Sequence, residues 1–122
     1  MGEWRTASLF VCLLLAAGGV QNTAPEFTMA LTGDSIITRS LSVYEEPAYL
    51  EMIEMIRGAD VAFTNLEVLL HDYEMAPAAR SGGTWMRADP KMADELVWAG
   101  FDLVAMANNH SGDYGVEGMV AT

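Results

Sequence analysis

The sequence predicts an α/β fold with a mainly parallel sheet, and three observations support this prediction. Apolar segments of strand length alternate with segments of helical period along the chain. Glycine or proline separates one segment from the next. Residues 103–107 form an unbroken apolar run, as expected of a strand that is buried on both faces of a parallel sheet. At 122 residues the chain is one small domain or a piece of a larger one.

The predicted elements follow from local signals. Pro47 suits a first helical turn and Gly58 suits a helix exit, while Asp89 and Pro90 suit the start of a second helix that ends at Gly100. Another helix is expected to start near residue 116, with its N-terminus capped by Asp113. The strands are expected at 27–32, 61–65 and 103–107, the helices at 47–57 and 90–99, and a loop without periodicity at 71–83.

The first 24 residues read as a targeting segment. Arg5 is their only basic residue, residues 7–20 are apolar and uncharged, and a polar stretch with small residues follows. This order is typical of a secretory signal peptide, and the apolar run is shorter than the ~20 residues of a membrane-spanning helix. We therefore expect an exported protein of the extracellular space or cell envelope. The alternatives are an uncleaved anchor that holds it at the membrane through residues 7–20, or a buried core helix.

Charge and cysteine content exclude several classes of function. The chain has 6 basic and 17 acidic residues, which gives a net charge of −11. Nucleic acid is not an expected partner, because phosphate binding requires Lys and Arg. A single cysteine excludes an internal disulfide framework and a multi-cysteine zinc site. An anionic partner would need a bound cation between itself and this protein.

Polar residues follow three of the predicted strands. Asp34 ends the first, Asn65 and Glu67 end the second, and Asn109 and His110 end the third. The carboxyl ends of parallel strands lie along one edge of a sheet, where ligands bind. Carboxylate, amide and imidazole groups together suit a divalent metal ion such as manganese, iron or zinc. With an unperturbed pKa near 6.5, His110 could protonate a leaving group.

Each polar segment also has an ordinary structural interpretation. Gly-Asp after a strand is usually a turn, Asn65 and Glu67 could serve only the loop backbone, and residues 108–113 could form a surface turn. His71 and Asp72 lie in the variable loop and are expected to be solvated. The coincidence of three polar strand ends favours a functional site over these readings.

Three motifs carry a resemblance to a known family. Leu31-Thr-Gly-Asp34, residues 59–67 (ADVAFTNLE) and residues 100–115 (GFDLVAMANNHSGDYG) resemble the CapA family of capsule synthesis proteins, which is associated with poly-γ-glutamate. That family is similar in fold to the calcineurin-like metallophosphoesterases. The resemblance implies a four-layer α/β sandwich of two sheets flanked by helices, of which residues 25–122 would be the N-terminal part.

The resemblance also implies roles for particular residues. Asp34 matches the aspartate of the metallophosphoesterase Asp-x-His motif, although Ile36 stands where the histidine would be. Glu67 or Asn65 would bridge metal ions, Asn109 would be a metal ligand, and His110 would be the catalytic histidine. The later histidine motifs of both families would lie beyond residue 122, so this piece by itself is expected to be inactive.

Two functions from different classes follow. The first is a metal-dependent hydrolase or transferase-like component of capsule or poly-γ-glutamate production, acting on an anionic polymer or a phosphoester. The second is a non-catalytic envelope protein that binds an anionic polymer or helps to export it. A gene fragment without a stable fold is the third reading, because an incomplete sheet leaves an open edge.

Overall fold

The computed structural model describes residues 25–122. The predicted signal peptide, residues 1–24, lies outside the described residues. Within residues 25–122 no helix combines the length and apolar character needed to cross a membrane. In chain order the elements are β1 (Met29–Ser35), α1 (Pro47–Arg57), β2 (Val61–Leu66), β3 (Leu69–Leu70), β4 (Arg87–Ala88), α2 (Met92–Ala99), β5 (Leu103–Ala105) and α3 (Gly115–Ala121).

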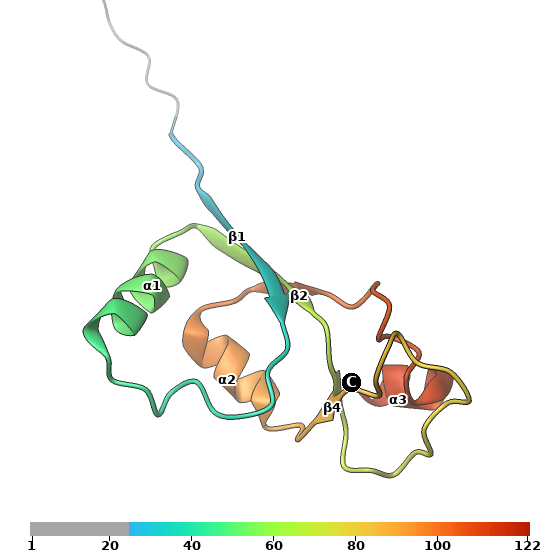
Figure 1. The fold of residues 1–122 in the computed structure, drawn as a ribbon. Helices are drawn as coiled ribbons and strands as arrows, with labels where there is room; N and C mark the ends of the chain where they lie inside the picture. Colours follow the sequence, from blue (N-terminus) through green and yellow to red (C-terminus); the bar gives the residue numbers. More distant parts are fainter. Residues whose placement is uncertain (1–24) are drawn as a thin grey trace, which may run out of the picture.

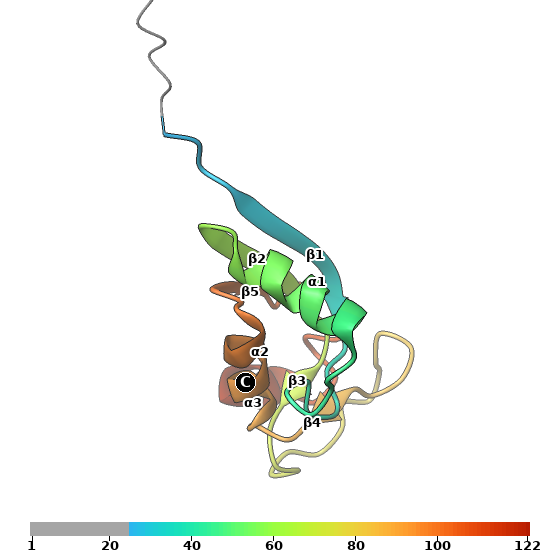
Figure 2. The ribbon, with the colours of Figure 1, turned by 90° about the vertical axis from the view of Figure 1, so that its left-hand side faces the viewer.

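The main sheet is parallel and has the strand order β1-β2-β5. Its central strand, β2, pairs with β1 on one side and with β5 on the other. Figures 1 and 2 show that α1 and α2 lie on the same face of this sheet, while α3 lies beyond the carboxyl ends of the strands. The prediction of an α/β fold with a parallel sheet is confirmed.

The core lies between β2 and these two helices. Along β2 the buried positions alternate, as they must in a strand with one covered face. Ile53 of α1 is 2% exposed, and burying a side chain of that size contributes about 1.5–3 kcal/mol. Two clusters result, one of Ile53, Ile56, Ala62 and Ala99, and one of Ile37, Leu66, Val68, Leu70, Ala88, Met92 and Leu96.

A second, two-stranded parallel sheet is formed by β3 and β4 beyond the end of β2. The 71–86 loop connects β3 to β4. The hydroxyl of Thr122 accepts a hydrogen bond from the Leu70 backbone N–H at 3.0 Å and so ties the end of α3 to β3. The predicted loop therefore has both ends fixed by one small sheet.

A bulge in β1 decides which side chains meet at the end of the sheet. Leu31 pairs with Phe63 and Asp34 pairs with Asn65, so two residues of β1 stand opposite the single residue Thr64. The buried Thr64 hydroxyl donates to the Gly33 carbonyl at 2.9 Å and lies 2.7 Å from the Ser35 hydroxyl. Without the extra residue, Gly33 rather than Asp34 would face Asn65.

The sheet face opposite the helices is open in the described residues. Leu31, Phe63 and Leu103 lie in one row across the three strands. Leu31 and Leu103 are exposed, as is Met29 further along β1, and Phe63 is half-buried. A row of exposed apolar side chains on a sheet is a surface that favours contact with further polypeptide.

Two predicted boundaries and one prediction about burial differ from the structure. β1 runs on to Ser35, past the expected glycine stop, because the bulge lets it rejoin β2. The prediction that residues 103–107 are buried on both faces is wrong for the described residues, since β5 is an edge strand with Leu103 and Val104 exposed. α2 begins at Met92, two residues after Pro90, and the Asp89 carboxylate accepts the Lys91 N–H at 2.9 Å in the turn that leads into it.

The C-terminus of α2 supplies a stability test. Gly100 has φ 98°, and a Cβ at this position would approach the Cγ of Arg57 to 2.7 Å. We expect Gly100→Ala to lower the free energy of unfolding by more than about 1 kcal/mol, measured by urea denaturation. The control is Gly33→Ala, where a Cβ would have no neighbour within 4 Å. Equal losses in the two variants would contradict this account.

Glu95 of α2 binds the segment that follows β1. Its carboxylate accepts the backbone N–H groups of Leu41 at 2.9 Å and Ser42 at 2.8 Å. The hydrogen bond from the Ser42 backbone is the main cause that lowers the pKa of Glu95. A carboxyl with a lowered folded-state pKa stabilises the fold fully above its unfolded pKa of about 4.3, and this contribution disappears as the pH falls through the folded value. We therefore expect Glu95→Gln to lower the urea midpoint at pH 7.

That difference between Glu95→Gln and the unmodified chain should shrink on acidification, as the carboxyl becomes protonated. Glu51→Gln, at an exposed position of α1, serves as the matched control and should leave the midpoint unchanged at both pH values. A constant difference from neutral to acidic pH would show that the Glu95 carboxylate does not act in this way.

Candidate functional site

The side-chain amide of Asn65 lies at the centre of the strand ends. Its Nδ2 donates to Oδ1 of Asp34 at 2.9 Å and to Oε2 of Glu67 at 3.2 Å. One NH2 group therefore holds two carboxylates from β1 and from the turn after β2. Two acidic side chains so close together would repel each other without a donor or a cation between them.

Asn108 fixes the direction in which this amide points. The Nδ2 of Asn108 donates to the Leu66 carbonyl at 2.9 Å, and its Oδ1 accepts the His110 backbone N–H at 3.0 Å. Both partners belong to the backbone, so the Asn108 amide has one favourable orientation. Its Nδ2 then also donates to Oδ1 of Asn65 at 3.0 Å, and the Asn65 NH2 must face the carboxylates.

His110 lies beside this pair of carboxylates and is almost fully buried. Its Nδ1 is 2.8 Å from Oδ2 of Asp113, which is 0% exposed. Its other ring nitrogen, Nε2, is 3.9 Å from Oε1 of Glu67, which is too long for a hydrogen bond. The imidazole is thus held on one side, and its second nitrogen faces the acidic pair. We call Asp34, Asn65, Glu67, Asn108 and His110 the strand-end cluster.

Asn109 has different neighbours from those of Asn108. Its side chain is exposed and its Nδ2 donates to the Gly82 carbonyl of the 71–86 loop at 3.2 Å. A Cβ on Gly82 would approach the Asn109 carbonyl oxygen to 2.3 Å, so the loop backbone lies directly against this residue. The Oδ1 of Asn109 is not used in that contact.

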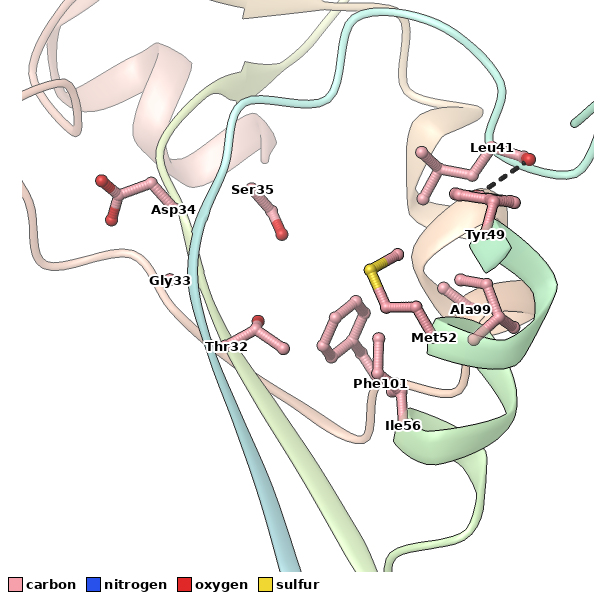
Figure 3. Close-up of a pocket in the computed structure, with 11 residues that line it drawn as sticks. Thr32, Gly33, Asp34, Ser35, Leu41, Tyr49, Met52, Ile56, Ala99 and Phe101 are labelled. Atoms are coloured by element: carbon pink, nitrogen blue, oxygen red, sulfur yellow. Dashed lines mark hydrogen bonds between the residues drawn. The ribbon is translucent and has the colours of Figure 1, made fainter. Parts of the chain in front are cut away.

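A cavity of about 300 Å³ lies near the cluster but on the other side of β1. Figure 3 shows Thr32, Met52, Ile56 and Phe101 directed into it, whereas the carboxylate of Asp34 points away. The cavity is lined mainly by apolar side chains between β1 and α1. It therefore belongs to the helix-covered face of the sheet, and Asp34 is the one residue of the strand-end cluster that also lines it.

The predicted site residues divide into two groups. Asp34, Asn65, Glu67 and His110 come together through hydrogen bonds and short contacts. Asn109 is the next residue to that group but turns its amide toward the 71–86 loop. Among residues 25–122, no three His, Cys, Asp or Glu side chains are arranged to hold a metal ion. Asp34 and Glu67 are the two carboxylates that the Asn65 amide brings together.

Two residues of the site were missed by the sequence analysis. Asp113 was expected to cap α3, but the helix has Tyr114 at its N-cap, and the Asp113 carboxylate points to His110 instead. Asn108 stands next to the residue that the motif singles out, and the sequence offers no signal for choosing between two adjacent amides. For Asp113 the available signal was its spacing from His110, because the two residues lie three apart in a turn.

The prediction that His71 is solvated is wrong. His71 is 1% exposed, packs edge-on against Tyr114 with 4.4 Å between ring centroids, and lies with Nδ1 3.3 Å from the Glu74 carboxylate. Its position at the end of β3, beneath α3, buries it. Asp72, which follows it, is exposed as expected.

A parallel sheet with an acidic and imidazole cluster at its strand ends defines the class of protein as an α/β protein with its polar site at the carboxyl edge of the sheet. Residues 28–122 match the family described as "Bacterial capsule synthesis protein PGA_cap". The chain belongs to this family, and the resemblance inferred from the motifs is confirmed.

Two relatives come from Sinorhizobium fredii (strain NBRC 101917 / NGR234) and are named uncharacterized protein y4sH and uncharacterized protein y4uA. Each is 39% identical to this chain over 104 residues, which is 83% of this chain and 23% of the relative. The chain therefore spans about a quarter of the length of these relatives.

The role of Asn108 can be tested by changing its donor into an acceptor. In Asn108→Asp, a carboxylate oxygen would face Oδ1 of Asn65 and the Leu66 carbonyl, both of which are acceptors. We expect the free energy of unfolding to fall by about 1–3 kcal/mol in urea denaturation. Asn109→Asp is the control and should cost less, because that side chain is exposed. Equal costs would contradict the orienting role of Asn108.

Proposed function

We propose that this protein takes part in the synthesis or export of an anionic capsule polymer, such as poly-γ-glutamate, through a hydrolase- or transferase-type reaction at the strand-end cluster. One observation carries the proposal. The Asn65 amide gathers the carboxylates of Asp34 and Glu67 beside the second ring nitrogen of His110. Membership of the capsule synthesis family supports the choice of polymer.

His110 is the acid/base group of this proposal. With Nδ1 directed to Asp113, Nε2 is the nitrogen left to exchange a proton with a substrate. Glu67 lies 3.9 Å from that nitrogen, so a substrate or water oxygen that binds there would contact both groups. The ring is nearly buried, which limits competition from bulk water.

A divalent cation is the proposed cofactor, with Asp34 and Glu67 as the carboxylates that would hold it. The donor set fits a hard cation bound through one or two carboxylates, with water and substrate oxygens completing its shell. Among manganese, iron and zinc, this oxygen-rich set favours manganese. Such an ion polarises a phosphoryl or carbonyl oxygen and makes bound water nucleophilic near neutral pH. It would also offset the repulsion between an acidic protein and an anionic polymer.

The predicted amide ligands would contribute less directly. The Oδ1 of Asn65 already accepts a hydrogen bond from Asn108, and its NH2 lies between the two carboxylates where a cation would bind. Among residues 25–122, no hydrogen bond is made to the Oδ1 of Asn109. We therefore propose Asn109 as the amide ligand and Asn65 as the group that keeps the two carboxylates together when no cation is bound.

We further propose that the described residues are the N-terminal part of a four-layer sandwich. Support comes from the exposed row that contains Leu31 and Leu103, which a second sheet would cover, and from relatives about four times as long as the matching segment. Export through residues 1–24 is likewise a proposal and rests on the sequence pattern alone.

The alternative is a non-catalytic envelope protein that binds the polymer or helps to export it. It is favoured by the finding that residues 25–122 hold no group of three His, Cys, Asp or Glu side chains suited to a metal ion. In that case the exposed carboxylate of Asp34 would bind polymer through a bridging cation, and the exposed amide of Asn109 would bind it directly.

Manganese binding by the chain itself tests the proposed cofactor. We expect one Mn²⁺ per chain, measured by titration with electron paramagnetic resonance detection of free ion. Asp34→Asn and Glu67→Gln should each weaken binding by at least about tenfold, because each removes a charged oxygen ligand. Glu51→Gln on the exposed face of α1 should bind as the unmodified chain does. Absent binding, or equal loss in all three variants, would contradict the assignment.

Catalysis is tested in a protein of the full family length. Hydrolysis of a phosphodiester and of a γ-glutamyl amide should require His110, and the His110→Ala protein should keep its circular dichroism spectrum. Stoichiometric binding of poly-γ-glutamate without turnover under manganese, iron or zinc would instead establish the binding protein.

A further inference from the structure

We propose that Asp113 is a positioning residue that joins two parts of the site, the 71–86 loop and the His110 imidazole, through one buried carboxylate. The inference deepens the proposed function, on which it rests for the meaning of His110 as the reacting group. The contacts of Asp113 with the loop and with the imidazole belong to the chain itself and do not depend on that function.

The loop side of this joint consists of backbone donors. Oδ1 of Asp113 accepts the Gly82 N–H at 3.1 Å, and Oδ2 accepts the Met86 N–H at 2.7 Å. The Asp113 carbonyl accepts the Ala78 N–H at 2.8 Å. Three backbone N–H groups of the loop therefore donate to Asp113. Within the loop, the Trp85 indole N–H also donates to the Ala78 carbonyl. The loop has one defined position above the strand ends.

The imidazole side uses the same oxygen. Oδ2 of Asp113 lies 2.8 Å from His110 Nδ1 as well as 2.7 Å from the Met86 nitrogen. An unprotonated Nδ1 would set its lone pair against a carboxylate oxygen, so Nδ1 must carry the proton. In the neutral ring this leaves the lone pair on Nε2, the nitrogen that faces Glu67.

Burial makes the two sides depend on each other. Asp113 is 0% exposed, and a buried carboxylate is stable only when donors satisfy its oxygens. If the loop withdraws its N–H groups, the carboxylate loses the donors that compensate its charge, and its hold on the imidazole changes. If the imidazole turns away, the loop is left beside an under-satisfied carboxylate.

Gly82 is a second position at which the coupling between the loop and the imidazole can be tested. A Cβ there would approach the Asn109 carbonyl oxygen to 2.3 Å and its Nδ2 to 2.7 Å. Gly82→Ala therefore has to displace the loop, and with it the Gly82 N–H that Asp113 accepts, while the side chains of Asp113 and His110 stay unaltered. A coupled site predicts that the imidazole responds to this displacement of the loop.

The first measurement is made on the unmodified chain. Nitrogen-15 NMR of the His110 ring, at a pH where the ring is neutral, should show Nδ1 as the protonated nitrogen and Nε2 as the unprotonated one. A ring protonated on Nε2 overturns the inference at once, whether or not any variant folds.

Two variants then test the coupling. In Asp113→Ala the tautomer preference of His110 should be lost, and the Gly82 and Met86 amides should exchange with deuterium about tenfold to a hundredfold faster, since each loses a charge-assisted hydrogen bond. In Gly82→Ala the Met86 amide should exchange faster by a similar factor, and the His110 ring resonances should move. Thr84→Ala, at an exposed position of the same loop, is the control and should change neither.

The outcomes separate this inference from the proposed function. Unchanged His110 resonances in Gly82→Ala, with the Met86 amide released, would show that the loop and the imidazole are independent and would overturn the coupling. A correct tautomer and correct coupling in a full-length protein that has no hydrolase activity would leave the joint established and the proposed reaction wrong.

Discussion

The organisation of the strand ends depends on the orientation of one amide. Asn108 is held by backbone groups on both sides, so it can only donate to Asn65, and Asn65 can only donate to Asp34 and Glu67. As a result, the neutral side chain of Asn65 presents its NH2 group to two carboxylates. Two acidic groups can then stay close together at neutral pH without a basic residue between them. The chain carries few such residues to spare, with 6 basic against 17 acidic.

The position of Asp34 depends in turn on the backbone. The bulge in β1 advances the strand by one residue, and the buried hydroxyl of Thr64 satisfies the carbonyl that the bulge displaces. Bulges recur beside functional sites because they redirect one side chain while the rest of the sheet keeps its register. Here the redirected side chain is the carboxylate that meets Asn65. The polar site is therefore specified by the register of the apolar sheet beneath it.

What the sequence could predict follows from how local each signal is. Helix α1 has its proline, its basic last turn and its terminal glycine within a dozen residues, and its predicted bounds are confirmed. The end of β1 was predicted too early, because the bulge depends on Thr64, about thirty residues away in sequence. Asp113 was assigned to the wrong role, since the donors that its carboxylate satisfies come from the 71–86 loop. Asn108 and Asn109 are neighbours with identical side chains, and only the geometry of the turn decides which one faces the strands.

The polar site and the open sheet face use different side chains of the same strands. Within residues 25–122, none of the hydrogen bonds that order Asp34, Asn65, Glu67 and His110 involves the exposed row that contains Leu31 and Leu103. Polypeptide that covers this row would add apolar contacts, and it would find the strand ends already arranged. Since the helices occupy one face and the polar groups lie at the edge, the sheet can gain a covering layer without disturbing the amide that holds the two carboxylates. The arrangement of these polar groups is thus a property of β1, β2 and β5 and the turns that follow them, and any further polypeptide would meet strand ends whose central groups are already positioned.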